Sequence, residues 1–136
     1  MLISGNVMID GRAMTGPGGV VLKNDEHLDV FKQWAALGKQ QGAAFFLQLN
    51  HPGRQMPASL GQPTWAPSAV PMALGKMSKF FNPPKPMSQD KINDIIRRFV
   101  TTARLAEQAG FDGVEIYEKA QTEGGSPSIT VLDSDC

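Results

Sequence analysis

Residues 43–49 read AAFFLQL, and this nearly continuous apolar run is the stretch that decides the fold class. A strand with one solvated face alternates apolar and polar side chains, whereas an unbroken run suits a strand buried on both faces of a parallel sheet. Gln48 is the one long polar side chain in the run. A buried amide needs hydrogen-bond partners from the protein or from a ligand. Gln48 is therefore a candidate binding residue, with a structural amide at a strand end as the alternative.

The chain before this run predicts a strand followed by a helix. Residues 2–10 are mostly apolar and are interrupted at Gly5, as at a strand end where the backbone turns or approaches a ligand. Asn24 or Asp25 is a suitable N-cap for a helix that runs to about Gln41, with apolar residues at roughly 3.6-residue spacing.

The chain after the run predicts a long connection, a second helix and a third strand. The connection covers residues 50–87 and holds most of the ten prolines, and a connection of this length in a compact domain is usually functional. Ser88 is a good N-cap for an amphipathic helix that ends at Gly110, and residues 111–117 predict a strand. Strands that alternate with helices indicate βαβ units and a parallel sheet.

Composition excludes several classes of function. The 13 Lys and Arg residues balance 13 Asp and Glu residues, so the chain lacks the basic stripe expected of a nucleic-acid binder or of a polybasic membrane-surface domain. No apolar stretch is long enough to span a membrane, and residues 1–10 do not resemble a signal peptide. The single cysteine, Cys136, permits no intrachain disulfide. We expect a cytoplasmic protein that handles a cofactor or a small substrate.

Four motifs in register resemble one enzyme family. Residues 46–55 read FLQLNHPGRQ, and Gln-Leu-x-His-x-Gly-Arg after a buried strand is similar to the Old Yellow Enzyme family of FMN-dependent NADH:flavin oxidoreductases. Residues 2–10, 66–70 and 109–116 resemble three further stretches of that family in the same order and spacing. Together these motifs cover residues 2–116.

The resemblance implies a fold and a domain boundary. The family fold is an eight-stranded (β/α)8 TIM barrel that binds its cofactor at the carboxyl ends of the strands. By resemblance, the chain is an incomplete α/β barrel that covers about the second to the fourth strand and the helices between them. Residues 1–117 are expected to form this partial FMN-binding domain. Residues 118–136 are polar, rich in Ser, Thr and Gly, and without periodicity, so we expect a disordered tail outside the family pattern.

The same resemblance implies a cofactor and two binding residues. FMN would take hydride from NAD(P)H and pass it to a small-molecule electron acceptor such as an electron-poor alkene. Gln48 stands where the family holds the pyrimidine edge of the flavin, because an amide donates and accepts at once. Asn6 stands where the second strand of the family meets that edge, with a simple turn residue as the alternative. FMN binding by this incomplete chain is expected to be weak or absent.

The sequence departs from the family at the end of the third predicted strand. The family continues there with His, two residues, Asn or His, and then Gly-Tyr; the His/Asn pair orients the substrate and the Tyr donates a proton. Tyr117, Ala120 and Thr122 occupy those three positions here, so we assign no catalytic residue. We therefore expect a fragment of an FMN-dependent ene-reductase that is inactive as it stands. The alternative is a truncated or mispredicted non-catalytic product, at most an interaction fragment.

Two other readings receive less support from the residues. His51 and Arg54 could act chemically, but stabilising the long connection is the favoured interpretation, and His27 lies too far along the chain to suggest a metal cluster with His51. A different phosphate-binding α/β domain would need a helix N-terminus at phosphate-loop spacing, and none is predicted after residues 16–19, which read GPGG.

Overall fold

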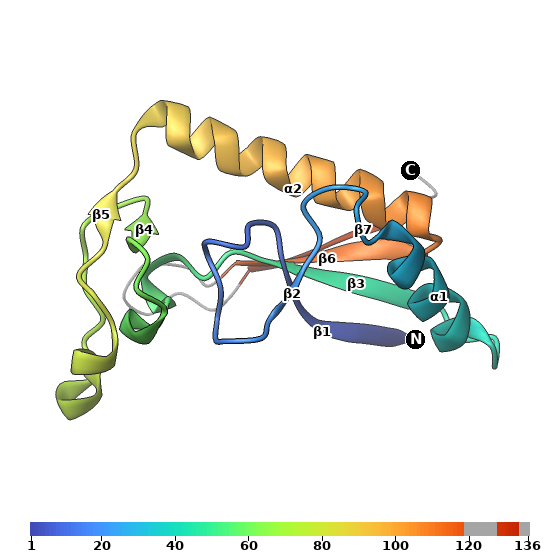
Figure 1. Cartoon of the computed structure of the whole chain (residues 1–136), viewed down its shortest axis with the longest axis horizontal. Helices are drawn as coiled ribbons and strands as arrows, with labels where there is room; N and C mark the ends of the chain where they lie inside the picture. Colours follow the sequence, from blue (N-terminus) through green and yellow to red (C-terminus); the bar gives the residue numbers. More distant parts are fainter. Residues whose placement is uncertain (119–127, 134–136) are drawn as a thin grey trace.

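Three parallel strands form the centre of the fold in the computed structural model, which describes residues 1–118 and 128–133. They are β1 (Leu2–Met8), β3 (Phe45–Asn50) and β6 (Gly113–Glu118), and they lie side by side in the order β1-β3-β6 (Figure 1). The parallel α/β fold predicted from the sequence is confirmed. The unbroken apolar run of β3 is explained by its central place in the sheet, since strands flank it on both sides.

Two further strands complete the five-stranded sheet. On one side, β2 (Val20–Val21) pairs in parallel with the end of β1. On the other, β7 (Ser128–Asp133) pairs with β6 in antiparallel orientation. The tail thus forms a strand at 128–133, where the sequence predicts disordered chain, because β6 offers a free edge whose backbone groups need partners. Residues 119–127 and 134–136 of the expected tail lie outside the described residues.

Two helices cover one face of the sheet. The helix α1 (Leu28–Lys39) begins later than the predicted N-cap at Asn24 or Asp25, because those residues form a turn instead, with the Leu28 N–H bonded to the Asp25 carbonyl. The helix α2 (Gln89–Ala109) matches its prediction. The Ser88 hydroxyl caps its first turn, and Gly110 ends it in the left-handed conformation, at φ +92°.

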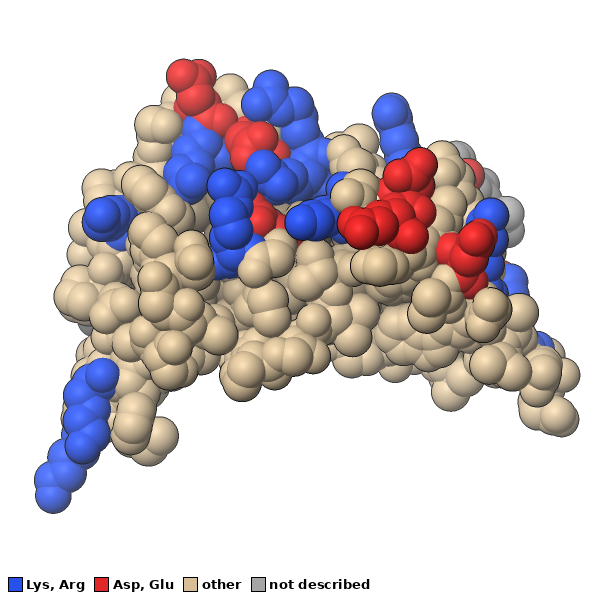
Figure 2. Space-filling view, in the orientation of Figure 1, with Lys and Arg blue, Asp and Glu red and all other residues tan. Residues whose placement is uncertain are grey.

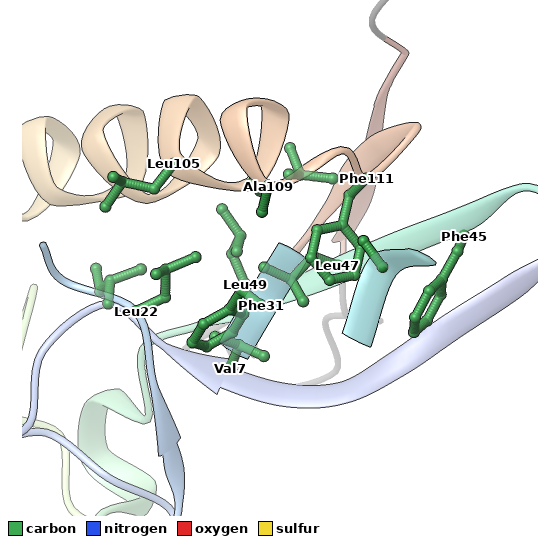
Figure 3. Close-up of a cluster of buried hydrophobic side chains, with 13 residues drawn as sticks. Val7, Leu22, Phe31, Phe45, Leu47, Leu49, Leu105, Ala109 and Phe111 are labelled. Atoms are coloured by element: carbon green, nitrogen blue, oxygen red, sulfur yellow. The ribbon is translucent and has the colours of Figure 1, made fainter. Parts of the chain in front are cut away.

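The core lies between these helices and the sheet (Figure 3). Alternate residues of the strands supply it, so Leu47 and Leu49 of β3 are both fully buried. One polar side chain enters this layer: Thr102 of α2 donates a 2.6 Å hydrogen bond to the Leu22 carbonyl. The cluster joins thirteen buried residues, namely Val7, Ile9, Leu22, Phe31, Ala35, Phe45, Leu47, Leu49, Leu105, Ala106, Ala109, Phe111 and Val114.

At the amino end of the strands, aromatic rings close the core. The ring centroids of Phe45 and Phe111 lie 5.1 Å apart, and Trp34 meets both rings edge-on at 5.7 and 5.9 Å. Beside them, the Asp112 carboxylate accepts a 2.8 Å hydrogen bond from the Phe45 N–H and a 3.1 Å bond from the Lys39 ammonium. These contacts tie α1, β3 and the start of β6 together.

At the carboxyl end, the long connection folds as a separate arm (Figure 1). Within it, β4 (Trp65–Ala66) and β5 (Lys85–Pro86) pair in parallel. The connection also contains three short 3-10 helices, two before β4 and one between β4 and β5. Those helices are Gly53–Gln55, Ala58–Leu60 and Gly75–Phe80.

The surface divides by charge. Figure 2 shows acidic and basic side chains gathered over the α2 side of the molecule, whereas the side along β1 is almost bare of charge in this view. In β1, Leu2 and Ile3 are nearly half exposed, and β2 pairs only with its last two residues, Val7 and Met8. Neither helix in residues 1–118 and 128–133 is long and apolar enough to cross a membrane.

Candidate functional site

A row of polar side chains crosses the three parallel strands on the face opposite the helices. Asn6 of β1 pairs with Gln48 of β3, and Gln48 pairs with Glu115 of β6, so the three residues share one register position. Because side chains alternate along a strand, Gln48 faces away from the layer formed by Leu47 and Leu49. The two predicted binding residues, Gln48 and Asn6, are therefore neighbours.

An irregularity in β1 creates this alignment. Between Ile3 and Asn6, the pairing of β1 with β3 shifts, so that β1 advances three residues while β3 advances two. Gly5 lies within the shift, and glycine inside a strand often marks such a bulge. The Ser4 hydroxyl fills the interrupted ladder by accepting a 2.8 Å hydrogen bond from the Gln48 backbone N–H. Regular pairing would have turned Asn6 toward the helices.

Hydrogen bonds link the side chains of the row in pairs. The Gln48 Nε2 atom donates to Glu115 Oε2 over 2.9 Å, and Asn50 Nδ2 donates to Asn6 Oδ1 over 2.9 Å. Glu115 and Asn50 are buried, with 4% and 3% of their surfaces exposed, whereas Asn6 is exposed. Buried polar groups thus find partners within the row, and Asn6 presents its side chain outward.

A cavity of about 250 Å³ opens at the carboxyl ends of β1 and β3. Asn6, Asn50 and His51 contribute to its wall, together with Gln55 and Phe81 from the long connection. Gln48 does not line this cavity, since it lies one step deeper along β3 than Asn50. The structure therefore places Asn6 at the cavity and Gln48 behind it.

His51 separates this cavity from a second one. Its Nδ1 atom accepts a 3.2 Å hydrogen bond from the Gly53 N–H, which leaves the proton of the neutral ring on Nε2. Burial is the main cause that lowers the pKa of His51 to about 4. The positive charges of Lys91 and Arg98 act in the same direction, and the negative charge of Asp10 opposes them. His51 is therefore neutral near pH 7. Together with the Arg54 guanidinium, which donates to carbonyls of the connection, it fits the predicted role in holding this loop.

The second cavity, of about 300 Å³, has a charged wall. Burial raises the pKa of Asp10, but two side-chain hydrogen bonds and one backbone bond from Arg12, with the charges of Arg12 and Arg98, lower it overall to about 2. Arg98 of α2 lies 3.7 Å from the Asp10 carboxylate and so links the loop after β1 to that helix. Within α2, Arg98 also bonds Asp94 over 2.8 Å. In the part of the chain that the structure describes, no cluster of His, Cys, Asp or Glu is arranged for a metal ion.

Sequence reasoning missed Asn50 and Asp10. Asn50 could have been found from the strand period, because it lies two residues after Gln48 and shares its face. Tyr117 pairs with Asn50 one step beyond Glu115 and is half-buried. Ala120 and Thr122, the other two positions that depart from the family pattern, lie outside the described residues.

Comparisons with known proteins agree with the resemblance. A model of the NADH:flavin oxidoreductase / NADH oxidase family matches residues 1–121. The NADH-dependent flavin oxidoreductase iccE of Talaromyces variabilis is 35% identical over 133 residues, covering 86% of this chain and 32% of the relative. An NADPH dehydrogenase of a Geobacillus strain is 32% identical, covering 83% of this chain and 33% of the relative. The chain thus spans about a third of the length of these curated relatives.

Solved structures give the same result for the fold. An Old Yellow Enzyme homologue from Zymomonas mobilis superposes with a TM-score of 0.70 at 28% identity, covering 85% of this chain and 34% of that chain. Morphinone reductase superposes with a TM-score of 0.71 at 27% identity, covering 85% and 34%. The described sheet and helices are therefore a part of such a barrel, as the sequence predicts.

Proposed function

Because the chain belongs to the NADH:flavin oxidoreductase / NADH oxidase family, we propose that residues 1–117 supply part of the FMN site of an ene-reductase. In this proposal the reductant is NAD(P)H, the acceptor is an electron-poor alkene or a related small molecule, and the enzyme works in the cytoplasm. FMN, when bound, accepts hydride from the nicotinamide and passes it to the acceptor. The observation that carries the proposal is the row of Asn6, Gln48 and Glu115 at one register position of three parallel strands.

The polar groups of this row suit one edge of a flavin. The pyrimidine edge presents a ring N–H between two carbonyl oxygens, and a primary amide can accept from the first while it donates to one of the others. Gln48 and Asn6 both carry such amides, and both lie near the carboxyl ends of barrel strands, where enzymes of this fold bind their ligands. We assign flavin binding to these two side chains.

The described residues also support weak cofactor binding by this chain alone. A cavity of about 250 Å³ beside Asn6 is smaller than the roughly 300–1,000 Å³ of typical small-molecule sites. Its wall comes from two strands and the long connection, which leaves most of a flavin and its phosphate without contacts. We therefore propose that FMN dissociates readily from the 136-residue chain.

Catalysis by this chain is proposed to fail for a second reason. The proton-donor position holds Thr122, whose hydroxyl is far less acidic than a phenol, and the orienting pair is replaced by Tyr117 and Ala120. Loss of general acid catalysis alone costs about a hundred- to ten-thousand-fold in rate. Loss of positioning adds a further decrease. The departure at these three positions also favours the alternative of a truncated or mispredicted non-catalytic product, at most an interaction fragment.

The test is consumption of NAD(P)H with cyclohexenone and added FMN, with and without the 136-residue protein. We expect no rate above that of free FMN. A second chain, in which residues from Tyr117 onward are replaced by the family pattern His-x-x-Asn-Gly-Tyr, is assayed in parallel. It shows whether the departure at these positions affects the rate. A protein-dependent rate that saturates in cyclohexenone with the unaltered chain would overturn the inactive-fragment proposal.

A coding-sequence comparison separates the two candidates. If the nucleotide sequence downstream of the codon for Ile116 encodes His-x-x-Asn/His-Gly-Tyr in another frame, the tail is a product of misprediction. If it does not, the departure at Tyr117 belongs to the protein, and the fragment must be judged on its FMN binding alone. Visible absorption of the purified protein measures that binding directly, because bound flavin is yellow.

A further inference from the structure

Glu115 is a buried carboxylate that accepts a side-chain hydrogen bond from Gln48, the predicted flavin ligand. It lies opposite Gln48 on the neighbouring strand, and 4% of its surface is exposed. The bond from Gln48 Nε2 to Glu115 Oε2 measures 2.9 Å. Among the described residues, no Lys, Arg or His forms an ion pair with Glu115. Removing a carboxylate from water lowers the free energy of unfolding, so an apolar side chain would stabilise the fold better if the role were structural alone.

A carboxylate opposite an amide restricts the amide to one orientation. Carboxylate oxygens accept hydrogen bonds, so Gln48 must present its Nε2 to Glu115. A flipped amide would place Oε1 against Oε2, two acceptors in contact inside a buried row. Glu115 therefore leaves Gln48 with one acceptor, Oε1, and one remaining Nε2 proton directed away from β6.

We infer that Glu115 is a positioning residue that fixes the side-chain amide of Gln48, so that the site selects a ligand edge offering a donor next to an acceptor. This inference rests on the proposed function, in which that edge is the pyrimidine ring of FMN. It adds a residue to the site and explains why Gln48 binds in only one of its two amide orientations. In that site, the negative charge of Glu115 would oppose the negative charge that the flavin gains on reduction.

Two consequences distinguish positioning from simple packing. First, replacing Glu115 weakens FMN binding only while Gln48 is present, because the effect passes through the amide. Second, removing the carboxylate while keeping its shape, as in Glu115→Gln, raises the midpoint potential of bound FMN, because less negative charge opposes reduction. A packing role would change neither the coupling to Gln48 nor the potential in this direction.

The binding experiment is a double-mutant cycle on the full 136-residue chain. FMN is titrated and flavin fluorescence is measured for the parent, Glu115→Ala, Gln48→Ala and the double variant. Glu115→Ala is expected to weaken FMN binding about five- to thirtyfold in the parent and less than twofold in the Gln48→Ala background. Glu107→Gln, which removes an exposed carboxylate of α2, is the control for net charge and is expected to change nothing. Equal losses of FMN affinity in both backgrounds would overturn the positioning role of Glu115, but they would not contradict the proposed FMN site.

A ligand-free measurement covers the case in which the chain binds no FMN. The side-chain NH₂ of Gln48 is followed by ¹⁵N–¹H NMR in the parent and in Glu115→Gln. One of its two protons is expected to resonate downfield in the parent and to move upfield in the variant, while near-ultraviolet circular dichroism stays the same. Unchanged Gln48 resonances would overturn the inference. A shifted resonance together with an FMN affinity that Gln48→Ala leaves unchanged would instead overturn the proposed flavin site, and with it the ligand assigned to the amide.

Discussion

At the amino end of the parallel strands, aromatic rings from α1, β3 and the residues just before β6 pack together. At the carboxyl end, by contrast, amide, carboxylate and imidazole side chains form hydrogen bonds. Phe45 and Phe111 represent the first group, and Gln48, Glu115 and His51 the second. The strand β3 contributes to both groups, with Phe45 at its amino end and Gln48 nearer its carboxyl end. Barrels of this kind place stability at one end and binding at the other, so substitutions at the two ends should give different kinds of effect.

The largest effect is expected at the amino end, from Phe111→Ala. Phe111 is 4% exposed and touches the rings of both Trp34 and Phe45, so its removal leaves a cavity that the sheet and α1 cannot close. The expected loss is about 3–5 kcal/mol in the free energy of unfolding. Urea unfolding followed by tryptophan fluorescence measures this loss.

Phe80→Ala is the matched control, because Phe80 is 54% exposed at the far end of the long connection. Its expected change is within about 0.5 kcal/mol. If the two substitutions destabilise the chain equally, the amino-end cluster is not the stabilising element and the comparison between the two ends fails.

The local patterns of the sequence predicted much of the amino end. The helix α2 has both a Ser N-cap and a Gly at its carboxyl end, and its boundaries followed from these signals. The start of α1 did not follow in the same way, because residues near Asn24 form a turn whose side-chain bond mimics a helix cap. The pairing of β2 was beyond prediction, since two apolar residues carry no period.

The carboxyl end shows where sequence reasoning stops. Strand period places Gln48 and Asn50 on one face, but it does not say which residues of the next strand lie opposite them. The one-residue shift beside Gly5 turns Asn6 to that face. Without the shift, Asn6 would point toward the helices. Glu115 became a partner of Gln48 through register alone. Resemblance to a family supplied the two amides, whereas their partners required the structure.

At the carboxyl end, His51 is expected to make the stability of the chain depend on pH. Burial lowers the pKa of His51 from 6.5 to about 4, so the unfolded chain takes up a proton at a pH where the folded chain does not. The stability that His51 contributes is therefore complete above pH 6.5 and is lost as the pH falls toward 4. The expected loss is about 3 kcal/mol, and unfolding free energies measured at several pH values between 7 and 4 test it.

Substitution by Asn separates His51 from the other groups that titrate in acid. In His51→Asn, the amide oxygen can still accept the bond from the Gly53 N–H, but the side chain no longer takes up a proton. The slope between pH 6.5 and 4 is expected to flatten in this variant. His27→Asn, at an exposed position before α1, should leave the slope unchanged. Equal slopes for all three proteins would show that His51 is not the group responsible.

The smallest effect is expected from Gly38→Ala, and its sign is the informative part. Inside a helix, Ala is favoured over Gly by about 1 kcal/mol, so helix propensity alone predicts a more stable protein. Gly38 lies in the last turn of α1, however, and a Cβ atom there would overlap the ring of Phe45. Overpacking of a core costs about 1–3 kcal/mol, so the net change should be a loss of stability.

A second variant tests the cause, because Gly38→Ala combined with Phe45→Leu removes the ring that the methyl group meets. The Gly38→Ala change should then be less costly in the Phe45→Leu background than in the parent, as measured by urea unfolding of all four proteins. If Gly38→Ala stabilises the parent chain, the aromatic cluster at the amino end yields to a methyl group, and it is not the closely packed counterpart of the polar carboxyl end.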